Sequence, residues 1–141
     1  MAGISYRLFF RDPVSEEHIR ETLGCGNLTP DRGEWRKSEG TAHAWTTGQI
    51  LEPLHPYERA VFEKHFPGAP SVSGVDIQSS GDDRGKLAVE VACLCAELGP
   101  FLVFGWGGAF TPEACHKLKA EQRGFEGAEP SIRCDLPAET G

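Results

Sequence analysis

Alternating apolar and polar positions at the start of the chain predict a half-buried strand. In "ISYRLFF", residues 4–10, the two kinds of side chain alternate as far as Leu8. The next segment carries the signals of a helix start. Ser15 is suited to cap a helix, and Glu16 and the following glutamate favour its positive end. We therefore expect a short helix over residues 16–23.

Two polar segments follow, each with a single large apolar residue. "GEWRKSE", residues 33–39, and "TAHAWTTG", residues 41–48, are separated by Gly40. Short strands on either side of a glycine turn predict a hairpin. Trp35 and Trp45 are its only large apolar side chains.

The segment "LHPYERAVFEKHFPG", residues 54–68, predicts a second helix. Pro56 suits the first turn, and a Pro-Gly pair ends the pattern. On this helix we expect Tyr57, Ala60 and Val61 to face inward, and Glu58 to stay in solvent with the other charged residues.

The longest apolar stretch is "GKLAVEVACLCAELGPFLVFGWGG", residues 85–108. Its first part predicts a helix that starts at a cap, Asp82 or Asp83, and runs to about residue 98. A strand buried on both faces is expected over 101–106, because no polar residue alternates into it. Together with a strand over 72–79, this unit has the length of a right-handed crossover between parallel strands.

These elements define the expected fold. A last helix is expected from Thr111 to about residue 123, and then a loosely ordered tail from about residue 125, in which only "SIRCDL" suggests a short edge strand. The chain is predicted to form a single α+β domain, 1–141, with a mixed, mostly antiparallel sheet and helices packed mainly on one face.

Composition narrows the classes of partner. The chain has 141 residues, 39% of them hydrophobic, which is enough for one core. Its net charge is −7, divided as −2 over residues 1–70 and −5 over residues 71–141. This sign disfavours direct binding to nucleic acid or to anionic membranes and favours a basic protein partner.

The start of the chain and the cysteines indicate the cellular compartment in which we expect the protein. The start, "MAGISYRLFFRDP", lacks the pattern of a secretory leader, and the five cysteines have no framework spacing. We therefore expect a cytoplasmic protein with reduced thiols.

The sequence contains two candidate enzymatic sites. The glycine cluster at residues 105–113 follows a strand and precedes a helix, as phosphate-binding loops do, but it lacks the complete motif of a dinucleotide or P-loop site. We therefore favour the interpretation that these glycines form a tight turn beside Trp106. Cys25, in a Gly-Cys-Gly turn, could form a catalytic couple with His43 or His55. Neither pattern is complete, so we expect no catalytic residue, no metal ligand and no cofactor.

A protein-binding surface is the alternative that the sequence favours. Trp35 and Trp45 are aromatic residues in polar surroundings, which is typical of interface anchors. The alternative is that both tryptophans cover one end of the core. Asp82 and Asp83 suit a helix cap, and Glu90 lies on the exposed face of the same helix, from which acidic groups could contact a basic partner. These five residues form the predicted partner-binding set.

The segment "VDIQSSGDDRGKLAVEVACLCAELGPFLVFGW", residues 75–106, resembles the C-terminal halves of short bacterial proteins of the immunity-protein type found in polymorphic toxin systems. This resemblance implies a non-catalytic protein that neutralises a cognate toxin by occluding its active site. A small enzyme, built on Cys25 or on the glycine loop, and a structural or regulatory adaptor remain the alternatives.

Overall fold

The computed structural model describes residues 4–26, 28–50, 53–70, 73–81, 83–105 and 107–134. The helices within them are α1 (Glu16–Cys25), α2 (Pro56–His65), α3 (Lys86–Cys95), its 3-10 extension η1 (Ala96–Leu98), and α4 (Pro112–Ala120). The strands are β1 (Ile4–Phe10), β2 (Thr29–Asp31), β3 (Glu34–Glu39), β4 (Ala42–Thr46), β5 (Gly74–Ser80), β6 (Phe101–Gly105), β7 (Gly108–Phe110) and β8 (Ile132–Arg133).

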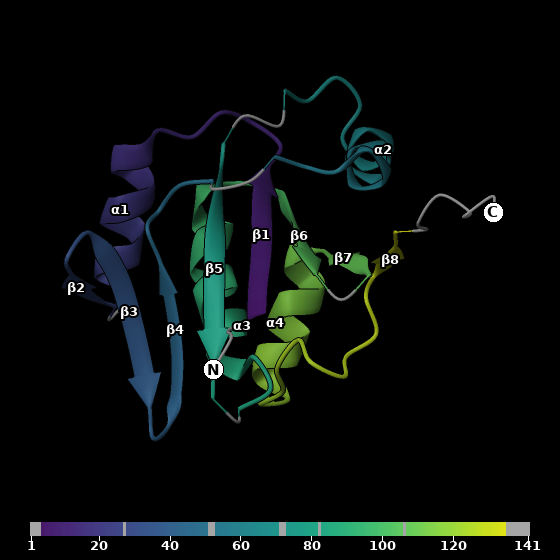
Figure 1. Cartoon of the computed structure of the whole chain (residues 1–141). Helices are drawn as coiled ribbons and strands as arrows, with labels where there is room; N and C mark the ends of the chain where they lie inside the picture. The colour runs from purple at the N-terminus through teal and green to yellow at the C-terminus, as the bar shows by residue number, and fades with distance from the viewer. Residues whose placement is uncertain are drawn as a thin grey trace.

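The strands form one sheet in the order β2-β3-β4-β5-β1-β6-β7-β8 (Figure 1). Every neighbouring pair in this order is antiparallel. The predicted α+β domain with a mostly antiparallel sheet is thus confirmed. The expected crossover also exists, because β5 and β6 are each antiparallel to β1 and so point the same way. They do not touch as a parallel pair, however, since β1 lies between them.

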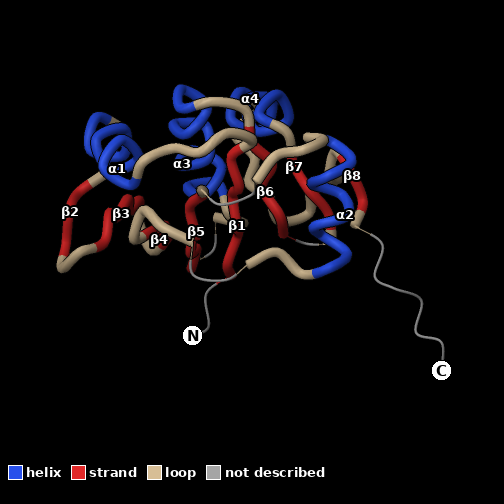
Figure 2. Tube along the Cα trace, turned by 90° about the horizontal axis from the view of Figure 1, so that it is seen from above, coloured by secondary structure: helices blue, strands red, loops and turns tan. Residues whose placement is uncertain are grey.

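The helices are divided unequally between the two faces of the sheet. α1, α3 and α4 lie side by side on one face, and α2 lies on the other (Figure 2). α3 is the central helix, and seven of its ten residues are buried. The main core lies between these three helices and the sheet, where Tyr6, Leu8 and Phe10 of β1 face the helices. The prediction that helices pack mainly on one face is correct.

A smaller core under α2 explains why the alternation in β1 breaks at its end. Phe9 points to the α2 side, where its ring centroid lies 6.4 Å from that of Phe62 and 6.4 Å from that of Phe104. Phe10 points to the other side and packs on Phe101. The end of β1 is therefore covered on both faces, and both positions are apolar.

The α2 helix is turned differently from the prediction. Its buried residues are Glu58 and Phe62, while Tyr57 and Val61 are half-buried and Ala60 is exposed. A charged side chain is buried here because it has an ion-pair partner on the sheet, which a helical wheel cannot show. The expectation of a solvated Glu58 was wrong.

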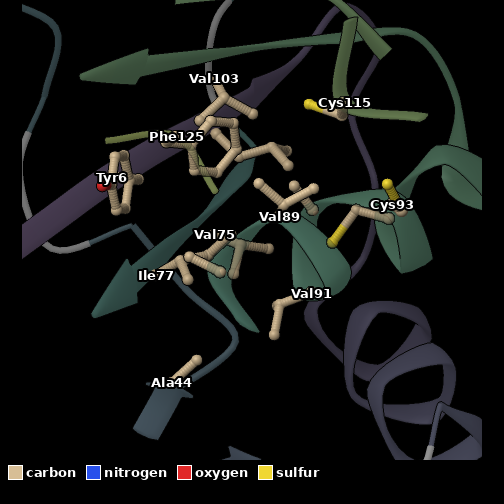
Figure 3. Packing of buried hydrophobic residues seen from close by; sticks show 14 of the residues in the cluster. Tyr6, Ala44, Val75, Ile77, Val89, Val91, Cys93, Val103, Cys115 and Phe125 are labelled. Carbon is tan, nitrogen blue, oxygen red and sulfur yellow. The ribbon is translucent and has the colours of Figure 1, made fainter. Parts of the chain in front are cut away.

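The segment after α4 packs against the body of the protein. Phe125 is completely buried, and its ring centroid lies 4.7 Å from that of Tyr6 and 4.9 Å from that of Phe110 (Figure 3). Ile132 and the next residue pair with β7, which confirms the edge strand expected in "SIRCDL". The loose tail expected from about residue 125 is thus not found up to Cys134. Residues 135–141 lie outside the described residues.

No helix in the described ranges combines the length and the apolar character that crossing a lipid bilayer requires.

Candidate protein-binding site

The two tryptophans predicted as anchors lie on opposite faces of the β3–β4 hairpin. In its register, Trp35 is opposite Thr46, and Arg36 is opposite Trp45. Because side chains alternate along a strand, Trp35 faces the same side as Ala44 of the main core, and Trp45 faces the other side. The structure therefore does not bring Trp35 and Trp45 together into one surface.

Trp35 lies in a groove between α1 and β3. The groove has a volume of about 530 Å³ and is lined by Glu16, Glu17, Arg20, Glu21, Gly24 and Trp35. The helix residues recur at three- and four-residue spacing and so form one side of α1. Gly24 leaves room for the tryptophan: a Cβ atom added there would lie 3.3 Å from Cη2 of the indole. A side chain at position 24 would therefore make a tight contact with the indole, so glycine favours the close approach of α1 and β3.

The groove is acidic. Three glutamates and one arginine line it. Arg20 pairs with Glu16 at 2.5 Å, but each side chain is about half exposed, so this pair contributes little stability. Among the ion pairs of the described ranges, none includes Glu17 or Glu21. The sequence prediction did not include these glutamates. Their i,i+4 spacing on the predicted helix, which precedes the hairpin with the tryptophans, could have indicated an acidic face.

Trp45 lies on the helix-free face of this part of the sheet, beside a row of polar residues. The Arg36 guanidinium is 5.4 Å from the centroid of the Trp45 ring. On the neighbouring strands, Ser5 Oγ and Gln78 Nε2 each donate a hydrogen bond to Asp76 Oδ1, both at 2.8 Å. Asp76 is buried by this network. Trp45 therefore borders a polar face and is already engaged by a cation of its own chain.

The same polar face ends at an ion pair that the sequence did not reveal. Arg7 Nη2 lies 2.5 Å from Glu58 Oε2, and Arg7 Nη1 donates to the carbonyl of Pro53 at 3.2 Å. The other carboxylate oxygen of Glu58 accepts a hydrogen bond from the backbone N–H of His55 at 3.0 Å. These contacts hold α2 on the sheet, so we assign Arg7 and Glu58 to the fold.

The predicted acidic residues have different surroundings. Both oxygens of Asp83 accept backbone hydrogen bonds at the start of α3, from Gly85 at 3.0 Å and from Leu87 at 2.9 Å. The N-cap residue of α3 is Gly85, so the expectation that Asp83 is the cap was wrong. Its carboxylate is nevertheless engaged by these two backbone N–H groups. Glu90 lies 3.5 Å from Lys37, which is on the same face of β3 as Trp35. Asp82 lies outside the described residues.

The thiol couple is not assembled. Cys25 ends α1 and is exposed. His43 lies on the other face of the sheet, where its Nδ1 is 2.8 Å from Ser38 Oγ, and His55 precedes α2, also on that face. No hydrogen bond within the described ranges joins Cys25 to either histidine. The structure therefore does not bring Cys25 together with His43 or His55, the couple that the sequence left open as an alternative.

The other cysteines are buried, and Figure 3 shows Cys93 and Cys115 among the residues of the main core. Burial raises the pKa of Cys93 to about 11 and that of Cys95 to about 12, and it raises the pKa of Cys115 further. These three thiols are therefore protonated near neutral pH and are poor nucleophiles. Within the described ranges, no three histidine, cysteine or carboxylate residues are grouped so that they could hold a metal ion.

The glycine cluster is a hairpin turn. Gly105 of β6 pairs with Gly108 of β7, and Gly107 before β7 has a φ of +73°. α4 begins only after β7, and Thr111 Oγ1 caps it by accepting the N–H of Ala114 at 3.2 Å. In the phosphate loops considered for this segment, the glycines lie between a strand and the N-terminus of a helix. Here β7 intervenes, so the pairing agrees with the tight-turn interpretation of the glycines and not with the phosphate-loop alternative.

Comparison with protein-family models found no match, and comparisons with curated proteins and with solved structures found none either. The function is therefore inferred from the residues of the site.

Proposed function

We propose that this chain is a non-catalytic binding protein that neutralises a basic partner protein, in the manner of an immunity protein and its toxin. The groove between α1 and β3, called here the α1–β3 groove, is the proposed contact. The observation that supports this proposal most directly is the position of Trp35, a large aromatic ring in a groove lined by Glu16, Glu17 and Glu21.

This combination suits an arginine or lysine side chain of the partner. A guanidinium group can stack on the indole of Trp35 while carboxylates bind its N–H groups. Glu17 and Glu21 have no ion pair among the described residues, so a partner cation would not first have to displace one. Binding of an arginine or lysine in the catalytic channel of a nucleic-acid-cleaving toxin would block access of the substrate phosphates.

The net charge of −7 supports the same proposal. Long-range attraction raises the association rate of an acidic inhibitor with a basic partner, and salt weakens this effect. Glu90 lies on the same side of the sheet as the groove and is an additional proposed contact. Trp45, Asp82 and Asp83 stay in the predicted set, and we expect Asp83 to contribute less because its carboxylate already accepts two backbone hydrogen bonds at the start of α3.

The genomic neighbourhood and co-expression test the proposal. We expect a neighbouring gene that encodes a toxin domain, and co-expression of this chain should protect cells from that domain. A neighbouring metabolic operon without a toxin gene would favour the enzyme alternative. Cys25→Ser should leave protection intact, whereas loss of function in a folded Cys25→Ser protein would contradict a non-catalytic role.

Charge reversal tests the groove itself. The double variant Glu17→Lys/Glu21→Lys should weaken binding to the toxin domain by about 10- to 100-fold, and the loss should shrink as salt is raised. The matched control is Glu113→Lys/Glu126→Lys, which changes the net charge equally at exposed positions away from the groove. Calorimetry would measure both. Equal affinities of the two double variants would contradict the assignment of the α1–β3 groove.

A further inference from the structure

A second groove lies on the opposite face of the sheet, between α2 and β8. Its volume is about 570 Å³, and its lining residues are Tyr57, Ala60, Val61, Lys64, His65, Ile132 and Arg133. The α2 residues follow a spacing of three and four, so they form one side of the helix next to its buried stripe. This surface is called here the α2–β8 groove.

The α2–β8 groove is apolar in the middle and basic at its rim. Half-buried Val61 and Ile132 pack against the smaller core from the groove. Lys64, His65 and Arg133 are exposed, and none of the described residues that line the groove is a carboxylate. The nearest charge partner is Glu129, 3.6 Å from Arg133, but both side chains are about three-quarters exposed and the pair contributes little. In a chain of net charge −7, this is a local excess of positive charge.

The groove is also bordered by the edge of the sheet. β8 is the last strand in the sheet order. The N–H of Cys134 donates to the carbonyl of Gly107 at 2.9 Å, so this amide points toward β7. Because backbone groups alternate along a strand, the N–H and C=O of Arg133 point away from β7. Within the described residues, they face no further strand, and edge groups of this kind can pair with an added strand.

We propose that the α2–β8 groove binds a short, extended, acidic peptide segment of another protein. The segment adds to β8 through the N–H and C=O of Arg133. One of its apolar side chains packs against Val61 and Ile132, and its carboxylates contact Lys64 and His65. Apolar contact, strand pairing and charge complementarity converge on one ligand, and neither a basic peptide nor a compact folded surface would satisfy all three. This site is independent of the α1–β3 groove, which has the opposite charge.

Peptide binding tests this proposal. The probe is a fluorescein-labelled octapeptide of alternating valine and glutamate, and the control probe alternates valine and lysine. Fluorescence anisotropy should show binding of the acidic peptide alone, weaker at high salt. Lys64→Glu/Arg133→Glu should lower the affinity at least about 10-fold. The matched control, Lys117→Glu/Lys119→Glu on α4, makes the same charge change elsewhere and should bind as the wild type does.

Other results would overturn the proposal. The proposal is wrong if the two peptides bind equally well, or if the two double variants lose equal affinity for the acidic peptide. It is also wrong if the acidic peptide does not bind at millimolar concentration. A wild-type dimer that Val61→Glu converts to a monomer in sedimentation would make a second copy the occupant. Binding that is seen only after deletion of residues 135–141 would make the chain's own end the occupant. Changes in the amide NMR shifts of Ile132 and Arg133 when the acidic peptide is added to the wild type would support its pairing with β8.

Discussion

Arg7 on β1 and Glu58 on α2 are 51 residues apart in the sequence, and their side chains form an ion pair that is only 13% and 6% exposed. Arg7 also binds the carbonyl of Pro53, and Glu58 binds the N–H of His55. One pair of charges thus connects the sheet, the loop before α2 and the helix itself.

Glu58→Gln should lower the free energy of unfolding by about 3 kcal/mol, because it leaves the Arg7 charge buried without its partner. Urea denaturation measures this change. The double variant Arg7→Met/Glu58→Met should lose less than either single variant, since it removes both charges and keeps apolar volume. A loss below about 0.5 kcal/mol for Glu58→Gln, which is usual for surface substitutions, would show that the pair is not a structural contact.

Phe125→Ala should lower the free energy of unfolding by about 3–5 kcal/mol, because the substitution leaves a cavity between Tyr6 and Phe110 in the main core. Thermal or urea unfolding would measure it. Glu126→Ala, at the exposed neighbouring position, is the control and should change little. Similar stability of the two variants would mean that the segment after α4 does not belong to the core.

One thiol of the folded protein should react quickly with a thiol reagent such as DTNB at neutral pH. Cys25 is exposed, whereas Cys93, Cys95, Cys115 and Cys134 are buried. All five cysteines should react once the protein is unfolded in urea. Cys25→Ser should remove the fast phase and leave the slow ones. A fast phase that persists in this variant would contradict the described burial.

Stability should fall at alkaline pH because of the buried thiols. Burial raises the pKa of Cys95 from 9.0 to about 12 and that of Cys93 to about 11. Above pH 9 the unfolded chain therefore releases protons that the folded chain keeps. The contribution of these thiols to the free energy of unfolding is complete below pH 9. It is lost as pH rises toward the pKa values of the folded state, by at most about 1.4 kcal/mol per pH unit for each thiol.

Urea denaturation between pH 8 and pH 11, with a reductant present, measures this effect. Cys95→Ala should be less stable than the wild type at pH 8, because the substitution removes a buried sulfur. The difference should narrow as pH rises, since the variant lacks one of the titrating groups. Parallel pH profiles for the two proteins would contradict the raised pKa of Cys95.

Local signals in the sequence were sufficient for several elements. Ser15 and Thr111 cap the helices that they were expected to cap, because a cap depends on residues within one helical turn. At α3 the N-cap is instead Gly85, although the Asp83 carboxylate accepts the N–H of Leu87 in the first turn. Contacts between distant segments were not predictable in this way. Glu58 was assigned to solvent because its partner lies 51 residues earlier on another element.

The faces of the two tryptophans depended on a detail of turn geometry. The hairpin pairs Glu39 with Ala42, so its turn has two residues, and Trp35 is opposite Thr46. A three-residue turn would have shifted the register by one and placed Trp35 directly opposite Trp45, on the same face. The polar composition of both strands gives no preference for either register. The sequence was therefore sufficient to select the two tryptophans as candidate anchors, but not to predict that they lie on opposite faces of the hairpin.

The place of β1 in the sheet has a consequence for how the protein folds. Its residue Ile4 pairs with Ser79, and Arg7 pairs with Phe104. β1 is synthesised before both of its neighbours, so it cannot be paired on both sides until β6 has also been made. Folding with such distant pairings is slow compared with that of helical bundles. During translation β1 must therefore remain unpaired on at least one side until β6 has left the ribosome.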